Sequence, residues 1–397
     1  VTTATGATLI GGLAGDSITT GADNTAVGYN ALITNETSAN NTAVGVSALK
    51  LNTGADNTAV GRGALLNQAA GTGNVAVGKD AGNDVTTGAN NVLVGTAAGD
   101  AFTDADKNVA IGDQALSSDT LGSRSTAVGF GALFTQNFTT ATDVYNVAVG
   151  TNAGLSVTTG TQNTILGGLA GDAITDADRN VAVGYSALTT NTVGSESVAI
   201  GAFALNSQNP ATATAMYNVA VGHNSGSAVT TGTKNTLIGG LAGDALTTGI
   251  TNVAVGYQAL SSDTAGKRSV AIGNAALFTQ NFTTATDTYN VAVGESAGLS
   301  VTTGTQNTLL GSLSGDAVTT GIQNVAVGMN SLGALTDADY NVAVGAYALD
   351  ADTMGSQTTA IGYGALSAQN FTTATNSLNT AVGYLAGLSV TTGENNT

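Results

Sequence analysis

One five-residue motif, Asn-Val/Thr-Ala-Val-Gly, recurs along the whole chain, in full form first at residues 24–28 and last at residues 379–383. The step between successive motifs is 17 residues almost everywhere, with one step of 16 and four steps of 21. The closing glycines stand at 11, 28, 45, 61, 78, 95, 112, 129, 150, 167, 184, 201, 222, 239, 256, 273, 294, 311, 328, 345, 362 and 383. A fixed short period predicts a stack of coils in which each covers its neighbour and none is stable alone.

The three residues before each closing glycine have the pattern of a short β-strand. The first is Val or Thr and the third is Val, Ile or Leu in all 22 copies, and β-branched residues at alternating positions favour a strand. The middle residue is Ala in most copies, with larger residues at Leu9, Leu93, Ile165, Leu237 and Leu309. Both faces of the strand are therefore apolar, as in a strand covered on both sides. We expect one face to line the coil's own core and the other to pack on a second copy of the chain.

Small residues around the motif predict where the backbone turns and where it packs tightly. The closing glycine predicts a positive φ or a neighbour too close for a Cβ atom. Three residues later every copy has Ala or Ser, as at Ala31 and Ser225, which indicates a tightly packed inner position. The next position is Leu in some coils, as at Leu32, and Gly in others, which instead carry a large hydrophobe three residues later, as at Ile18. We interpret this as two ways to fill one core slot at constant volume.

Polar residues separate the inside of the coil from its turns. No charged residue falls within any motif or at the Ala/Ser position, whereas Lys107, Arg124 and Arg179 each stand five residues before a closing glycine. A buried unpaired charge is costly, so the uncharged positions are predicted to be interior and the charged ones to lie in exposed turns. The leading Asn, present in 17 of 22 copies, suits a turn and can form a ladder of stacked amides.

Composition excludes several classes of function. The net charge is −17 with nine Lys and Arg, which argues against electrostatic binding of nucleic acid or anionic membranes. The chain has no Cys, so disulfides and thiolate metal sites are excluded. No apolar run reaches membrane-spanning length. We expect residues 1–397 to be a single continuous β-solenoid segment of a longer fibre chain.

Two variants of the repeat resemble known families. The Ser-Val-Ala-Ile-Gly segments at 197–201 and 269–273 resemble the repeat of trimeric autotransporter adhesin heads. The longer unit at 24–32 (NTAVGYNAL) and its copies at 180–188 and 252–260 resemble repeats of bacteriophage tail-fibre proteins and related bacterial surface fibres. The resemblance covers essentially the whole chain and implies a left-handed parallel β-roll wound from three identical chains. The 17-residue period is longer than in adhesin heads, which leaves the coil shape open.

Each 21-residue step adds four residues in a loop after the Ala-Leu position. Three loops contain Gln-Asn-Phe-Thr-Thr-Ala-Thr, and the second has Gln-Asn-Pro-Ala-Thr-Ala-Thr. The loops could present aromatic side chains to a glycan or a neighbouring fibre, or fold back to cover an edge, and we favour the second interpretation. The candidate contact residues are Phe134, Phe138, Tyr145, Tyr217, Phe278, Phe282, Tyr289 and Phe371.

Few residues are candidates for catalysis or metal binding. The single histidine, His223, has no evident triad partner or second ligand, so we expect no enzymatic activity and no cofactor. Three turns have an Asp-x-Asp-x-Asn sequence similar to the opening of a calcium loop, without its later Gly and Glu. These metal candidates, which we interpret as solvated turns, are Asp104, Asp106, Asp176, Asp178, Asp337 and Asp339.

The residues together predict an all-β, parallel β-roll of about 22 short coils, and the resemblance implies that it is homotrimeric. The expected function is the structural shaft of an extracellular or virion fibre, similar to a phage tail fibre, which spaces a receptor-binding tip from an anchor during host attachment. The alternative is a bacterial trimeric surface adhesin or a self-assembling extracellular filament that binds through its lateral face. The expected partners are other copies of the chain and a cell-surface glycan or receptor, without nucleic acid and without membrane insertion.

Overall fold

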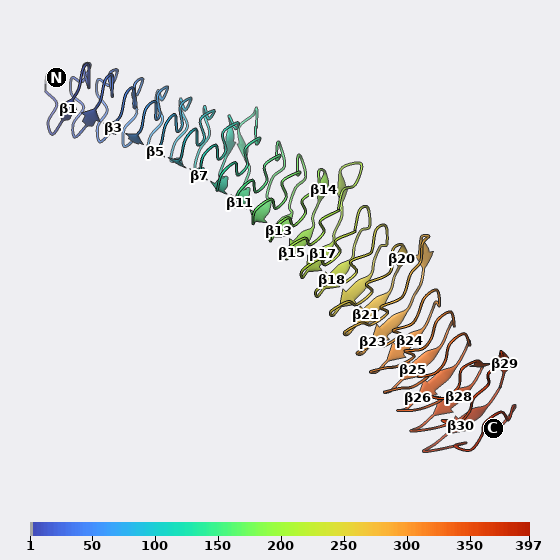
Figure 1. The fold of residues 1–397 in the computed structure, drawn as a ribbon. Helices are drawn as coiled ribbons and strands as arrows, with labels where there is room; N and C mark the ends of the chain where they lie inside the picture. Colours follow the sequence, from blue (N-terminus) through green and yellow to red (C-terminus); the bar gives the residue numbers. More distant parts are fainter. Residues whose placement is uncertain (1–2) are drawn as a thin grey trace. The chain divides into compact units, whose positions relative to one another are not determined.

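The computed structural model describes residues 3–397, which form short strands and turns without a helix. The chain forms two compact units: one comprises Val1–Glu196 and Ala211–Thr214, and the other Ser197–Pro210 and Ala215–Thr397. Each unit is a stack of coils in which every coil contributes one three-residue strand (Figure 1). The prediction of a parallel β-solenoid of about 22 coils with a period near 17 is confirmed.

In the first unit the motif strands pair in parallel with the motif strands of neighbouring coils. Ala26 of one strand pairs with Ala43 of the next, and the same motif positions pair across the 16-residue step, where Ala43 meets Ala59. Register therefore follows the motif and not the residue count. The strands are β1 (Thr8–Ile10), β2 (Thr25–Val27), β3 (Thr42–Val44), β4 (Thr58–Val60), β5 (Val75–Val77), β6 (Val92–Val94), β7 (Val109–Ile111), β9 (Thr126–Val128), β11 (Val147–Val149), β12 (Thr164–Leu166) and β13 (Val181–Val183).

The second unit repeats this arrangement. Ala271 pairs with Ala292 across a 21-residue step, and Ala292 pairs with Leu309 across a 17-residue step. The four extra residues of a long coil are thus accommodated outside the motif strand. The strands are β15 (Val198–Ile200), β17 (Val219–Val221), β18 (Thr236–Ile238), β19 (Val253–Val255), β21 (Val270–Ile272), β23 (Val291–Val293), β24 (Thr308–Leu310), β25 (Val325–Val327), β26 (Val342–Val344), β28 (Thr359–Ile361) and β30 (Thr380–Val382).

The long loops add two-residue strands that pair with the preceding coil. The parallel pairs are β8 (Gly122–Ser123) with β10 (Thr142–Asp143), β20 (Gly266–Lys267) with β22 (Thr286–Asp287), and β27 (Gly355–Ser356) with β29 (Thr375–Asn376). The remaining short strands are β14 (Gly194–Ser195) and β16 (Thr214–Ala215). In Figure 1, β20 and β29 lie on the side of their coils away from the motif strands.

The closing glycine meets both conditions that the sequence suggested as alternatives. Gly112 has a φ of 140°, and a Cβ atom there would lie 2.3 Å from the carbonyl oxygen of Gly129 in the next coil. Gly383 has a φ of 134°, and within residues 3–397 the nearest atom to its Cβ position is Ala386 Cβ at 3.8 Å. Glycine is therefore required in covered coils by conformation and by the stacking distance together.

The core of each coil is thin. The middle residue of the motif strand and the Ala or Ser three residues after the glycine are buried, as at Ala26 and Ala31. Where Gly82 replaces the core Leu, a Cβ atom would lie 2.6 Å from Leu93 Cδ1 and 3.3 Å from Val85 Cγ2. The space beside Gly82 is thus shared by Val85 and by Leu93, the large middle residue of the next motif strand, and constant volume along the stack stays a prediction. Leu32 occupies the slot with a φ of 53°, a left-handed conformation that is unfavourable for a residue with a Cβ atom.

A ladder of buried asparagines joins successive coils beside the motif strands. Asn163 Oδ1 accepts the backbone N–H of Asn180 in the next coil at 2.9 Å, and Asn163 Nδ2 donates to the carbonyl oxygen of Ala177 at 2.8 Å. Both side chains are fully buried. Since a buried amide is costly without partners, these bonds explain why the motif begins with Asn.

Candidate functional site: the outer strand face and the long loops

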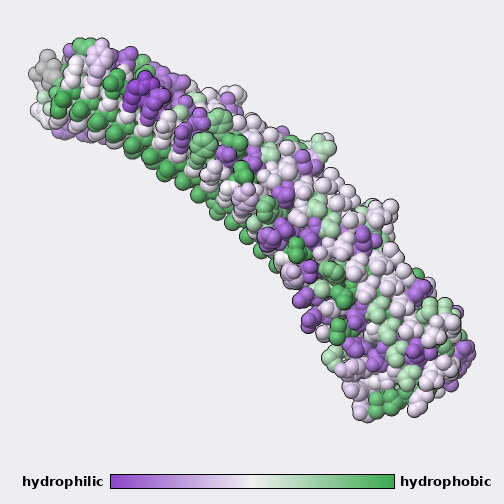
Figure 2. Space-filling model, viewed as in Figure 1, coloured by the Kyte–Doolittle hydropathy of each residue, from purple (hydrophilic) through white to green (hydrophobic). Residues whose placement is uncertain are grey.

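The outer face of the motif strands is apolar and partly exposed in the single chain. Val75, Val77 and Val149 are 36%, 38% and 39% exposed, whereas the intervening alanines are fully buried. Figure 2 shows hydrophobic residues in a row along the motif-strand side of the first unit. The motif strands of residues 3–397 contain no charged side chain. Burying the exposed part of one such valine would contribute roughly 0.5–1 kcal/mol, and the contribution repeats with every coil.

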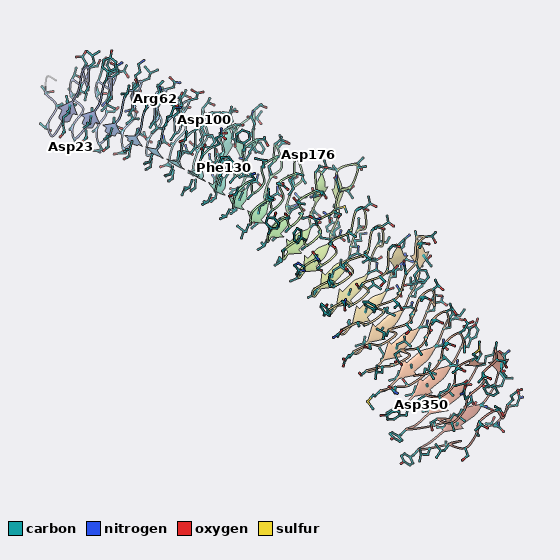
Figure 3. All side chains as sticks on the ribbon, viewed as in Figure 1. Asp23, Arg62, Asp100, Phe130, Asp176 and Asp350 are labelled. Carbon is teal, nitrogen blue, oxygen red and sulfur yellow. The ribbon has the colours of Figure 1, made fainter. Side chains whose placement is uncertain are left out.

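Exposed aromatic side chains beside this face were missed by the sequence reasoning. The residue after the closing glycine is Tyr in several coils, as at Tyr29 (56% exposed), and Phe at Phe130 (52% exposed; Figure 3). Tyr363 stacks on Tyr384 with ring centroids 5.6 Å apart, and Tyr347 meets the Tyr363 ring edge-on at 5.9 Å. Recurrence of Tyr directly after the closing glycine, at residues 29, 185, 257, 363 and 384, was the signal that could have identified these side chains.

Charged side chains stand at the border of the outer face. Arg62 Nη2 and Lys79 Nζ lie 3.5 and 3.4 Å from Asp80 Oδ2, and both cationic side chains are more than half exposed. Figure 3 shows Arg62 on the coil surface. Exposed ion pairs of this kind contribute at most about 1 kcal/mol. Their position confirms that charges near the motif lie in exposed turns.

In three of the four long loops, a buried carboxylate of the preceding coil binds the loop. Asp119 Oδ1 accepts the backbone N–H groups of Gly122 and Phe138 at 3.0 and 3.1 Å, and its Oδ2 accepts Gln136 Nε2 at 2.6 Å. Gln136 Oε1 in turn accepts Asn146 Nδ2 at 2.9 Å. The same network forms around Asp263 with Gln280 and Phe282, and around Asp352 with Gln369 and Phe371.

This network buries the loop phenylalanines. Phe138, Phe282 and Phe371 are 7%, 8% and 6% exposed. Phe134 and Phe278 are half-buried. These candidate contact residues therefore pack against their own chain and are not presented to a ligand in this conformation. The placement supports the interpretation that the loops fold back to cover an edge.

The loop tyrosines are exposed. Tyr145, Tyr217 and Tyr289 are 47%, 54% and 47% exposed. The Arg124 guanidinium lies 5.6 Å from the Tyr145 ring centroid, within cation–π distance, and Arg124 Nε donates to Asp143 Oδ1 at 2.8 Å. The third loop repeats this arrangement with Arg268, Asp287 and Tyr289. Arg124 and Arg268 thus each bind the end of the long loop in the next coil.

The Asp-x-Asp turns bond between coils and do not converge. Asp106 Oδ1 accepts the backbone N–H of Ala89 at 2.7 Å, and Asp104 Oδ1 accepts Thr87 Oγ1 at 2.6 Å. Asp178 and Asp339 likewise accept the N–H groups of Thr161 and Ile322, at 2.7 and 2.8 Å.

The first carboxylates of the other two turns bond hydroxyl groups. Asp176 accepts Thr175 Oγ1 at 3.1 Å, and Asp337 accepts Thr320 Oγ1. Figure 3 shows Asp23, Asp100 and Asp176 on separate coils. Within residues 3–397, no three acidic or histidine side chains form a group that could hold a metal ion. Five of the six carboxylates bond a residue of the preceding coil, and Asp176 bonds Thr175 in its own coil.

Burial perturbs several carboxyl groups. Burial raises the pKa of the Asp119 and Asp263 carboxyls, against the opposing effect of their Gln and backbone N–H donors. Burial also raises the pKa of Asp100 to about 6, and the nearby Asp84 and Asp80 carboxylates add to the shift. These groups are not clustered with a nucleophile. His223 meets the Phe203 ring edge-on at 6.2 Å, an aromatic contact without catalytic geometry.

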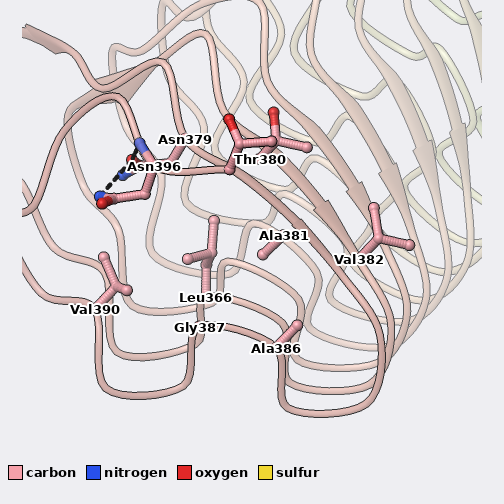
Figure 4. Close-up of a pocket in the computed structure, with 10 residues that line it drawn as sticks. Leu366, Asn379, Thr380, Ala381, Val382, Ala386, Gly387, Val390 and Asn396 are labelled. Carbon is pink, nitrogen blue, oxygen red and sulfur yellow. Dashed lines mark hydrogen bonds between the residues drawn. The ribbon is translucent and has the colours of Figure 1, made fainter.

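A cavity of about 360 Å³ lies in the last coil and is lined by Leu366, Ala381 and Val390 (Figure 4). These are core positions, and in preceding coils the equivalent positions are covered by the following coil, as at Ala360, which is fully buried. The cavity is therefore the uncovered cross-section of the core. The Asn ladder continues beside it, where Asn396 Nδ2 donates to Asn379 Oδ1 at 3.0 Å.

Comparison with known proteins adds no assignment. No protein-family model matches the chain, and no curated protein matches its sequence. Among residues 3–397 there is no helix that is both long enough and apolar enough to span a bilayer. The features that bear on function are therefore the outer strand face, its aromatic border and the anchored loops.

Proposed function

We propose that the chain is the structural shaft of an extracellular or virion fibre, similar to a phage tail fibre, which spaces a receptor-binding tip for host attachment. The observation that carries this proposal is the outer strand face, which repeats the same uncharged Val/Thr and Val/Ile/Leu pair on each motif strand. A long apolar surface without a central pocket suits assembly along its length better than recognition of a small molecule.

The partner of this face in the proposal is the same face of identical chains, in a left-handed homotrimer. Each copy presents residues such as Val149 and Ile272, at 39% and 37% exposure. Small apolar side chains in register allow close, repeated packing, and no charge has to be desolvated. Extended backbone ladders with buried asparagine bonds would give the shaft resistance to local opening and proteolysis.

Oligomeric mass tests the assembly. Analytical ultracentrifugation of the full chain should give three times the chain mass of 38.5 kDa. Val149→Asp should fold as a monomer but fail to assemble, because Val149 is exposed in the single chain and a charge there would be buried on assembly. Thr140→Asp, on the exposed part of a long loop, is the matched control and should assemble normally. A monomeric parent chain, or normal assembly of Val149→Asp, would refute the proposal.

The second candidate is a surface adhesin or filament that binds through its lateral face. The exposed loop tyrosines, fixed beside Arg124 and Arg268, favour it because rigid exposed aromatic rings are common binding anchors. Cell-adhesion assays on assembled parent and Tyr145→Ala/Tyr289→Ala fibres distinguish the two functions. Loss of adhesion in the variant supports a lateral adhesin, and unchanged adhesion supports the shaft.

A further inference from the structure

Three of the four long loops contain the tripeptide Asn-Phe-Thr, at residues 137–139, 281–283 and 370–372. Asn-x-Thr with x other than Pro is the acceptor sequence for N-linked sugars. Such tripeptides also arise by chance, so the structure has to show whether these asparagines are available and whether the fold otherwise needs the threonines.

The asparagine side chains are exposed and bound only through their oxygens. Asn137 Oδ1 accepts Thr120 Oγ1 at 3.0 Å, and Asn281 and Asn370 accept Thr264 and Thr353 in the same way at 3.2 and 3.1 Å. In the described chain no hydrogen bond joins the Nδ2 of these three asparagines to another protein atom. The nitrogen that would carry a sugar is therefore left to solvent while the amide is held in place.

The third residue of each tripeptide has no evident role in the fold. Thr139, Thr283 and Thr372 are exposed, and no hydrogen bond within residues 3–397 engages their hydroxyl groups. Among the neighbouring loop residues, Gln136 and the Phe138 N–H bind Asp119, and Thr140 is exposed like Thr139. Packing and hydrogen bonding therefore account for the Asn and the Phe but leave the Thr unexplained.

The remaining loop provides a natural contrast. It has Asn209-Pro210-Ala211, in which proline in the middle and alanine in the third position each remove the acceptor sequence. The other Asn-x-Thr tripeptides outside the loops differ in availability. Asn35 is buried and donates Nδ2 to the Ser38 carbonyl oxygen at 2.9 Å, and Asn40 donates Nδ2 to Asp56 at 2.9 Å. A further match stands at residues 395–397 in the last coil.

From this geometry we propose that Asn137, Asn281 and Asn370 are N-glycosylation sites, modified by a transferase that recognises Asn-x-Thr and uses an activated sugar phosphate. In the reaction Nδ2 attacks C1 of the sugar and forms the C–N bond. The C1–O bond to the phosphate breaks, the phosphate-bearing group leaves with the bonding electrons, and Nδ2 loses one proton to the transferase. The modification does not depend on the fibre function proposed above.

The position of the sites separates sugar from the outer strand face. The short strands beside these loops, such as β20 and β29, lie on the side of the coil away from the motif strands (Figure 1). Asn281 bonds Thr264, two residues before β20, and Asn370 bonds Thr353, two residues before β27, the partner of β29. Sugars there would therefore project from the side that the motif strands do not use. Assembly through the strand face and modification of the loops are compatible in one molecule.

Glycopeptide mapping of the full chain isolated from its native source tests the proposal. Added sugar mass is expected at Asn137, Asn281 and Asn370, and not at Asn35 or Asn209. A single hexose identifies a nucleotide-linked donor, and an oligosaccharide transferred as a block identifies a lipid-linked donor. Unmodified asparagine at all three sites would overturn the proposal, whatever the oligomeric state of the chain.

Variants produced in the same source sharpen the result. Thr139→Ala should remove the sugar from Asn137 alone, with unchanged circular dichroism, because its hydroxyl makes no hydrogen bond. Thr140→Ala, one residue further along the same exposed loop, should keep the sugar. Pro210→Phe/Ala211→Thr should add sugar at Asn209. Retention of the sugar in Thr139→Ala would contradict recognition of the tripeptide.

Discussion

The 17-residue and 21-residue coils stack with the same strand register but use different buried polar groups. Around β12, in a 17-residue step, Asn163 supplies both the acceptor and the donor that join its coil to the next. Before the first long loop the equivalent residue is Ser125, whose side chain is too short to bridge the coils, and Gln136 and Asp119 provide the bonds instead. Ala127 still pairs with Ala148 across the 21-residue step. An insertion is accommodated by exchanging the buried polar set while the strand stays unchanged.

The 17-residue and 21-residue coils share the closing glycine, and its substitution should have the largest effect on stability. Gly294→Ala would place a Cβ atom 2.4 Å from the Gly311 carbonyl oxygen, and Gly311→Ala would place one 2.6 Å from the Gly328 carbonyl. Each should destabilise the stack by more than about 4 kcal/mol, since backbone must move. In a protein of residues 1–397 alone, where the nearest atom to the Gly383 Cβ position is Ala386 Cβ at 3.8 Å, Gly383→Ala has only the φ cost, about 1–3 kcal/mol. Thermal melting and hydrogen exchange compare the three, and equal losses would show that crowding between coils is not the cause.

Substituting the buried polar residues should destabilise the 21-residue and the 17-residue coils separately. Asp119→Asn turns an amide donor toward Gln136 Nε2 or the Phe138 N–H, and Asn163→Asp turns a carboxylate toward the Ala177 carbonyl oxygen. Each change leaves buried groups unpaired and should cost about 1–3 kcal/mol. Hydrogen exchange should show the opening confined to the altered coil and its neighbours. Full stability in either variant would mean that the network has no fixed direction.

The pH dependence of stability distinguishes the buried acids from the ladder asparagines, which do not titrate. The pKa of Asp100 is raised to about 6 in the folded chain, so the folded state binds its proton more tightly than the unfolded state does. The associated stability is present at low pH and is lost as the pH rises from about 4 through about 6. Melting temperatures of parent and Asp100→Asn should therefore diverge across this window. Parallel curves would contradict the raised pKa.

The smallest expected effect on stability comes from the contact between Arg124 and Tyr145 at the end of the first long loop. Tyr145→Ala removes a partly exposed cation–π contact with Arg124 and should cost about 0.5–1 kcal/mol. Faster hydrogen exchange in residues 139–145, with the Phe138 amide still protected by Asp119, is the measurement. Loss of protection at Phe138 would show that the loop is held from its end and not by the buried carboxylate.

The sequence was sufficient for the solenoid because each structural requirement repeats in every coil. The closing glycine, the buried alanine and the exchange of Leu65 for Gly82 with Val85 could be compared across many copies. The burial of Phe138 could not be derived in this way, because it depends on the path of four inserted residues through space. A signal was nevertheless present, since Asp119, Asp263 and Asp352 all stand in the coils directly before an Asn-Phe-Thr loop.

If chains assemble as proposed, the uncharged strand face has a consequence for their alignment. Because each coil presents nearly the same pair of side chains, shifting one chain along another by one coil would lose few contacts. The loop-bearing steps close at glycines 150, 222, 294 and 383, which are separated by 72, 72 and 89 residues. In the proposed assembly, a shift of four coils would bring only two of the four loops level with loops of the neighbouring chain, whereas zero shift brings all four level.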